Sequence, residues 1–136
     1  MSFEELFNFT MQFSDCELLS LEEGHILLKT IVNKSDANPY GMAHGGYLYT
    51  LCDNAAGVLG YSVGYYVVTQ QASISYIASA KVDETLKIEG KLLHNGRSSK
   101  VAEVTITNES ERLICKGTFT LFPYNIFIVH LLIYIE

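Results

Sequence analysis

The stretch that decides this fold reads Asn38-Pro39-Tyr40-Gly41-Met42-Ala43-His44-Gly45-Gly46, and it leads into Leu51-Cys52-Asp53-Asn54-Ala55-Ala56-Gly57. A turn rich in Asn, Pro and Gly brings a histidine and two glycines to the start of a small, apolar segment. A single carboxylate, Asp53, lies inside that segment, although removing an ionised carboxylate from water is costly. Backbone donors at a helix start, together with a carboxylate within the helix, indicate an active site.

Residues 45 to about 60 predict one long helix. Its apolar side chains recur at helical spacing and cover one broad face, made of Leu48, Leu51, Cys52, Ala55, Val58 and Leu59. Four further positions are small, namely Ala55, Ala56, Gly57 and Gly60. Small residues let a sheet approach closely, so we expect this helix to pack against one.

The rest of the pattern predicts a short first helix and a series of strands. Ser2 is expected to cap the first helix, with Glu5 as its capping-box partner, and residues 61–66 are expected to be a connector. A hairpin turn is expected at Asn95-Gly96 and a strand end at Pro123. Strand patterns cover residues 16–21, 26–32, 67–80, 85–93, 98–107 and 113–122. This order of elements predicts an antiparallel α+β fold with the long helix packed across the sheet.

Length and composition limit the class of protein. The 136 residues fit one domain, which we expect to cover residues 1–125. The chain is 49% hydrophobic and 18% charged, which excludes intrinsic disorder. A formal net charge of -6 argues against nonspecific binding to nucleic acid. Cys16, Cys52 and Cys115 are scattered, which favours reduced thiols in a cytoplasmic protein over a disulfide framework, and the acidic N-terminus does not resemble a signal peptide.

The last segment, residues 126–136, is an apolar run broken by His130. A bilayer-spanning helix needs about 20 residues, so this run is too short and no membrane insertion is expected. Three interpretations stay open for it: an extra strand, a segment packed against a neighbouring subunit, or an aberrant end of the gene product.

The quoted stretch also resembles a known family. The pattern Asn-x-x-Gly-x-x-His-Gly-Gly, an Asp nine places after the His, and a Thr-x-x-x-x-x-x-Tyr strand are similar to the hotdog-fold thioesterases of the PaaI-like and thioesterase superfamily member 2 type. The resemblance covers roughly residues 32–122. It implies a long central helix wrapped by a curved antiparallel sheet, a homodimer with its sheets joined edge to edge, and often a dimer of dimers. The implied substrates are acyl-CoA thioesters, which water splits into a free acid and CoA.

The resemblance assigns a role to five residues. Asp53 would act as general base or as nucleophile, and the Gly45 amide would hold the oxyanion at a helix start where the dipole favours negative charge. Asn38 and His44 would orient the thioester and the water, and the Thr69 hydroxyl would position water near the acid. Each of the five has a structural alternative. Asp53 could accept a hydrogen bond within an interface, and Gly45 and Asn38 could serve turn geometry alone. His44 could be a structural histidine, and Thr69 an ordinary strand threonine.

The CoA moiety has its own candidate residues. Gly46 belongs to the same turn, and Lys91, Arg97 and Lys100 flank the Asn95-Gly96 turn, a loop that resembles a CoA-contacting region in relatives. Solvated surface charge is the alternative for each of these cations. Gln70 and Ser73 are weaker candidates for the pocket around Thr69. Five tyrosines are candidates to line an acyl or aryl pocket or simply to fill the core: Tyr47, Tyr49, Tyr61, Tyr65 and Tyr66.

Other functions are less well supported. A noncatalytic acyl-CoA-binding hotdog module, acting as sensor or scaffold, would not need Asp53. A hotdog dehydratase or hydratase would pair an Asp and a His in a different arrangement. The chain has no Gly-x-Ser-x-Gly elbow, no metal-ligand spacing among its histidines and no Gly-rich phosphate loop, so we expect no metal and no cofactor.

The spacing between Gly45 and Asp53 predicts how the site is assembled. At the usual helical rise the two residues lie roughly 12 Å apart along the axis. One subunit can hardly bring both to the same carbon atom. We therefore expect the Gly45 of one chain to face the Asp53 of another.

Overall fold

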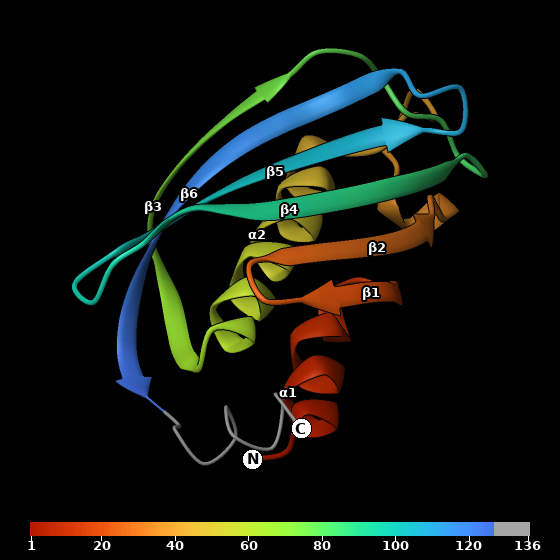
Figure 1. The fold of residues 1–136 in the computed structure, drawn as a ribbon. Helices are drawn as coiled ribbons and strands as arrows, with labels where there is room; N and C mark the ends of the chain where they lie inside the picture. The colour runs from red at the N-terminus through yellow and green to blue at the C-terminus, as the bar shows by residue number, and fades with distance from the viewer. Residues whose placement is uncertain (127–136) are drawn as a thin grey trace.

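The computed structural model describes residues 1–126, and its central feature is one long helix lying in the concave face of a curved antiparallel sheet (Figure 1). The helix is α2, Gly45–Ser62. The sheet has six strands in the order β1-β2-β4-β5-β6-β3, with bounds β1 Glu17–Glu22, β2 His25–Ile31, β3 Tyr65–Tyr76, β4 Thr85–Asn95, β5 Lys100–Asn108 and β6 Leu113–Ile126. The predicted α+β architecture is confirmed.

Small residues set the distance between α2 and the sheet. A Cβ built on Gly60 would lie 2.5 Å from Val67 Cγ2, and one on Gly90 of β4 would lie 2.9 Å from Leu59 Cδ1. Both distances are too short for a side chain, so these glycines allow the close approach. The inner face of α2 is fully enclosed, and Leu51, Cys52 and Ala55 have no exposed surface.

Shorter helices precede β1 and α2. Helix α1, Phe3–Thr10, begins at Ser2, whose hydroxyl accepts the Glu5 N–H at 3.1 Å. Its Phe3 ring lies 5.1 Å from the ring of Tyr61, so α1 covers one end of α2. Two 3₁₀ turns follow, η1 at Met11–Phe13 and η2 at Lys34–Asp36.

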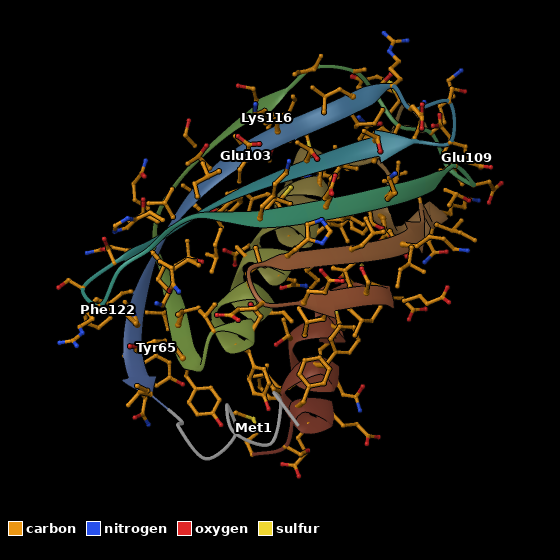
Figure 2. All side chains as sticks on the ribbon, in the orientation of Figure 1. Met1, Tyr65, Glu103, Glu109, Lys116 and Phe122 are labelled. Carbon is orange, nitrogen blue, oxygen red and sulfur yellow. The ribbon has the colours of Figure 1, made fainter. Side chains whose placement is uncertain are left out.

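The outer face of the sheet is polar. Lys116 of β6 and Glu103 of β5 form an ion pair there, with Nζ and Oε2 3.5 Å apart (Figure 2). On the outermost strand, β3, the side chains of Gln71 and Ser73 are exposed. Strand β3 forms one long edge of the sheet. Among the described strands it pairs only with β6.

Several strand boundaries differ from the prediction, and β3, predicted to reach residue 80, ends at Tyr76. Strand β6 continues through Pro123 to Ile126, because Pro123 lies beyond Leu121, the last β6 residue paired with β5. On that side the missing N–H breaks no ladder bond. The predicted connector at residues 61–66 is also wrong, since α2 runs to Ser62 and β3 begins at Tyr65, with Gly64 in the turn at φ 91°.

The hairpin between β4 and β5 is confirmed, but its turn lies elsewhere. The Gly96 N–H donates to the Ser99 carbonyl at 3.1 Å, so Arg97 and Ser98 are the central residues rather than Asn95 and Gly96. The Asn95 side chain instead accepts a hydrogen bond from the Lys100 ammonium. The Asn95 side chain is thus engaged by a buried cation, a contact that the local Asn-Gly turn rule does not include.

The apolar run at residues 126–136 lies outside the described residues except for Ile126, the last residue of β6. None of the helices in residues 1–126 is both long enough and apolar enough to cross a membrane.

Two alanine substitutions in α2 test the close approach to the sheet. Gly60→Ala should lower the free energy of unfolding by about 1–3 kcal/mol, because the new methyl group overlaps the stiff, branched Val67 side chain. Gly57→Ala is the matched control in the same helix, because a Cβ there meets nothing within 4 Å. It should raise stability by about 0.5–1 kcal/mol through helix propensity. Urea denaturation of both variants measures the difference, and equal effects would contradict this packing.

Candidate active site at the start of helix α2

The first turn of α2 presents a backbone donor. His44 caps the helix, and its Nδ1 accepts the Gly46 N–H at 2.9 Å. Because Nδ1 is an acceptor, the neutral ring carries its proton on Nε2, where it can donate to a ligand. The Gly45 N–H meets no acceptor within residues 1–126. The cap therefore engages the Gly46 amide and leaves the Gly45 amide and His44 Nε2 as donors.

The loop before α2 is held by Asn38. Its side-chain oxygen accepts the N–H groups of Tyr40 at 2.9 Å and Met42 at 3.1 Å. Its backbone N–H donates to the Met42 carbonyl at 2.7 Å. Asn38 thus has the turn-forming role that was its structural alternative. Its side-chain NH₂ group meets no acceptor in the described part of the chain, so it can still serve a ligand.

Asn38 and Gly45 line the same hollow, of about 380 Å³. Most of its wall is apolar, and the lining residues are Asn38, Met42, Ala43, Gly45, Leu48, Tyr76, Ile77, Ala78 and Ser79. The hollow contains none of the five tyrosines expected to line a pocket. Tyr49 packs on Phe119 instead, with ring centroids 5.6 Å apart.

Tyr76 is the residue in this hollow that the analysis of the sequence missed. Its hydroxyl donates to the Gly45 carbonyl at 2.8 Å. It ends the Thr-x-x-x-x-x-x-Tyr strand pattern, which was a signal that its side chain has a fixed place in the family. The pattern does not indicate that β3 ends beside the start of α2.

Asp53 lies on α2 facing β3, and Thr69 reaches it. The Thr69 hydroxyl donates a short hydrogen bond to Asp53 Oδ1. Asp53 is half-buried and Thr69 is exposed, so the carboxylate lies just inside the open edge of the sheet. The structure brings together this predicted pair, and Asp53 Oδ2 remains available to a ligand or a water molecule.

The two halves of the predicted site are separate within one chain. Thr69 pairs with Leu121 of β6, whereas Tyr76, beside Gly45, pairs with Cys115. Asp53 and Gly45 therefore lie beside different positions along the strands of the sheet. That one chain cannot complete the site alone stays a prediction.

Cys52, the neighbour of Asp53 in the sequence, is a poor candidate for a nucleophile. Cys52 and Cys115 are both buried, with their sulfur atoms 4.0 Å apart. The hydrogen bond to Cys115 and burial raise the pKa of the Cys52 thiol well above its ordinary value. Since the thiolate is the reactive form, the carboxylate of Asp53 is the better candidate for the chemistry.

The three predicted CoA-binding cations differ in position. Lys100 is 1% exposed; its Nζ donates to Asn95 Oδ1 and, at 3.0 Å, to the Gly96 carbonyl. The same Nζ lies 3.9 Å from the centroid of the Tyr65 ring, and burial lowers its pKa. Lys100 is thus a structural cation whose charge faces inward, which contradicts a surface role. Lys91 and Arg97 are exposed.

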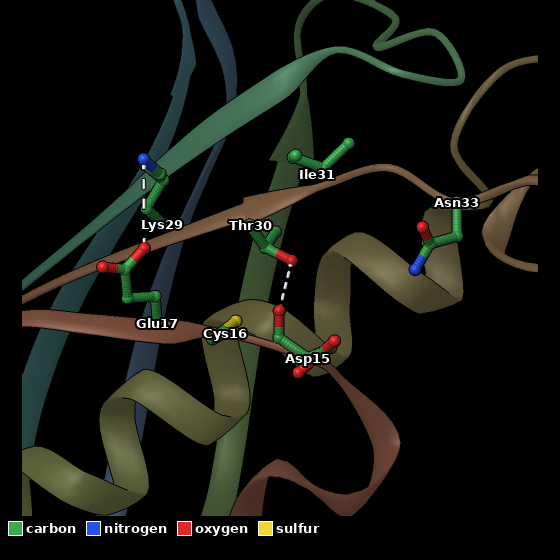
Figure 3. Close-up of a pocket in the computed structure, with 7 residues that line it drawn as sticks. All are labelled: Asp15, Cys16, Glu17, Lys29, Thr30, Ile31 and Asn33. Carbon is green, nitrogen blue, oxygen red and sulfur yellow. Dashed lines mark hydrogen bonds and ion pairs between the residues drawn. The ribbon is translucent and has the colours of Figure 1, made fainter.

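A second hollow, of about 360 Å³, lies between the start of β1 and the end of β2 (Figure 3). Thr30 donates there to the Asp15 carbonyl at 2.7 Å, and Lys29 pairs with Glu17 at 3.9 Å. Its lining includes none of the predicted site residues. Within residues 1–126, no group of three or more His, Cys, Asp or Glu side chains is placed to hold a metal ion.

Comparison with known proteins places the chain in a family. Residues 40–115 match the model of the thioesterase superfamily. The chain is 24% identical to the acyl-coenzyme A thioesterase PaaI of Escherichia coli K12 over 98 residues, which is 72% of this chain and 70% of that one. The residues that match the family model include the capped helix start and Asp53.

Two solved structures are more similar. A hypothetical thioesterase from Streptococcus pneumoniae TIGR4, solved with coenzyme A, is 40% identical with a TM-score of 0.87, over 92% of this chain and 98% of that chain. The same protein has been solved with alanine replacing one aspartate and with alanine replacing one threonine. The protein smu.793 from Streptococcus mutans UA159, bound to acetyl CoA, is 42% identical with a TM-score of 0.83, over 84% and 92% of the two chains.

The family match covers more than half of the chain, and the curved sheet around one long helix is the fold that the resemblance implied. Thioester hydrolysis is the activity named for this family and for the PaaI relative. The chain belongs to the thioesterase superfamily, as a PaaI-like hotdog-fold thioester hydrolase.

Proposed function

We propose that the chain hydrolyses acyl-CoA thioesters at a site completed by two copies of itself. The observation that carries the proposal is the division of the site: a free Gly45 amide at one level of the sheet, and the Asp53–Thr69 pair at another. Relatives solved with coenzyme A and acetyl CoA support the substrate class. An aspartate and a threonine are also the residues replaced in the Streptococcus pneumoniae structures.

The open edge of β3 is the proposed place of contact between the copies. A strand edge offers unpaired N–H and C=O groups to another strand. An antiparallel register of two β3 strands, related by a two-fold axis near their middle, would bring Thr69 of one copy toward the Tyr76 end of β3 in the other. In this register the Asp53 of one copy approaches the Gly45 of its partner. A further pairing of dimers stays a prediction.

In the proposed reaction, the thioester carbonyl oxygen accepts hydrogen bonds from the Gly45 N–H and His44 Nε2–H. The Asp53 carboxylate takes a proton from water as that water attacks the carbonyl carbon, or attacks the carbon itself. In both routes a C–O bond forms and the C–S bond breaks, and the CoA sulfur leaves as a thiolate that takes up a proton. The Gly45 amide stabilises the negative charge as it develops on oxygen, and Thr69 orients the carboxylate.

The CoA portion carries phosphates that need positive charge. Lys91 and Arg97 are proposed to meet them, because both are exposed on or beside the β4–β5 hairpin. This hairpin lies at the level of Thr69, since Lys100 pairs with Leu121 and Leu121 with Thr69. Cys16, Cys52 and Cys115 are all unpaired, which is consistent with a cytoplasmic enzyme.

Removing the charge of Asp53 tests the catalytic assignment. Asp53→Asn should lower kcat for acyl-CoA hydrolysis by roughly 10²–10⁴-fold, because an amide can neither accept the proton nor attack the carbonyl carbon. Asp83→Asn is the control, since it makes the same change at an exposed position whose φ of 75° Asn tolerates. Free CoA is measured with a thiol reagent. Full activity in Asp53→Asn would refute the assignment.

The Gly45 amide is tested by a substitution that removes its N–H group. Proline is accepted at the first position of a helix, and His44, at ψ 138°, already has the backbone conformation that a following proline requires. Gly45→Pro should lower kcat by about 10²–10³-fold. Gly45→Ala keeps the N–H, and its methyl group would lie 3.4 Å from Tyr76 Cζ, an ordinary contact. It should stay near wild type. Equal losses in both variants would show that bulk, and not the amide, matters.

Mixing two inactive variants tests whether the site is shared. Asp53→Asn and Gly45→Pro chains are unfolded together in equal amounts and refolded. Each hybrid dimer then contains one intact site, with Gly45 from one chain and Asp53 from the other, so about a quarter of the wild-type activity should return. A site contained in one chain predicts no recovery.

A further inference from the structure

Tyr76 connects the start of α2 to the apolar hollow beside it. It is the last residue of β3, and its hydroxyl donates to the Gly45 carbonyl at 2.8 Å. Its ring lines the hollow and lies within contact distance of Gly45. Its side chain therefore touches both the residue that would bind the oxyanion and the space next to that residue.

We infer that Tyr76 is a positioning and specificity-determining residue of this thioesterase: its hydroxyl holds the Gly45 peptide in place, and its ring forms one wall of the site for an uncharged, apolar acyl group. The inference rests on the proposed function, because it assigns the acyl group to the hollow beside Gly45.

The positioning role follows from the two consecutive glycines that begin α2. Glycine lacks a Cβ and has the widest backbone freedom of any residue, whereas an oxyanion donor acts best when it is fixed before the reaction. The His44 ring fixes Gly46 through the cap. The Tyr76 hydroxyl provides a comparable restraint for Gly45. Burial raises the pKa of Tyr76, which keeps this phenol protonated and able to donate.

The specificity role follows from the wall of the hollow. Met42, Leu48 and Ile77 contribute apolar surface, and no charged side chain is among its lining residues. A charged acyl group would lose its hydration there without gaining an ion pair, which is costly. A hydrocarbon chain loses nothing comparable and gains from leaving water. The Tyr76 ring, which is 51% exposed, limits the space on the β3 side.

The test compares Tyr76→Phe, Tyr76→Ala and wild type on acetyl-, hexanoyl-, dodecanoyl- and succinyl-CoA, with kcat and KM determined for each by release of free CoA. Tyr76→Phe should lower kcat on hexanoyl-CoA by roughly five- to tenfold, the effect of one lost hydrogen bond, with KM nearly unchanged. Tyr76→Ala should raise the ratio of dodecanoyl to hexanoyl kcat/KM by about tenfold, because the hollow gains the volume of the ring. Succinyl-CoA should be the poorest substrate of wild type.

Tyr40→Phe is the matched control, because Tyr40 is 81% exposed and lies outside the hollow. It should match wild type. A Tyr76→Phe enzyme with wild-type kcat would overturn the positioning role, and an unchanged chain-length ratio in Tyr76→Ala would overturn the specificity role. Hydrolysis of succinyl-CoA as fast as hexanoyl-CoA would contradict the apolar acyl site. If wild type released CoA from none of the four substrates, the proposed function itself would fail. If wild type is active and Asp53→Asn is not, the proposed function holds, and unchanged Tyr76 variants would then count against the role of Tyr76 alone.

Discussion

The close approach of α2 to the sheet is the constraint on which the rest of this structure depends. Gly60 and Gly90 have no side chain that would hold the helix and the strands apart. The inner face of α2 therefore lies within the buried core. This tight, rigid packing sets the position of each α2 residue along the strands. Asp53 is placed in this way, and at Gly45 the Tyr76 hydroxyl adds a hydrogen bond to the carbonyl.

The same rigidity separates two kinds of chemistry. The end of the helix offers backbone hydrogen-bond donors, and the middle of the helix offers a carboxylate whose partner, Thr69, belongs to the edge strand. A carboxylate placed directly beside the free amide would compete with a substrate oxygen for that donor. Their separation within the chain leaves the Gly45 amide without an acceptor among the described residues, as the proposed oxyanion role requires.

Much of the fold could be predicted from the sequence because its signals are local. The helical spacing of Leu48, Leu51 and Ala55 and the period of two in the strands indicate which face is buried, and the His-Gly-Gly turn marks the start of α2. The errors arose where distant residues decide the outcome. Lys100 looked like surface charge, but the Tyr65 ring and the Asn95 side chain surround its ammonium group. No local rule relates Tyr76 to Gly45, whose contact depends on where β3 ends relative to α2.

The exposed edge of β3 has a consequence for how the protein behaves at low abundance. If two copies must pair along this edge to complete a site, catalysis per chain depends on mass action. Turnover per molecule would then fall as the chain is diluted below its dissociation constant, and the catalytic output of a cell would rise more steeply than its protein level. The polar side chains along this edge, among them Gln71 and Ser73, would meanwhile keep an unpaired copy hydrated.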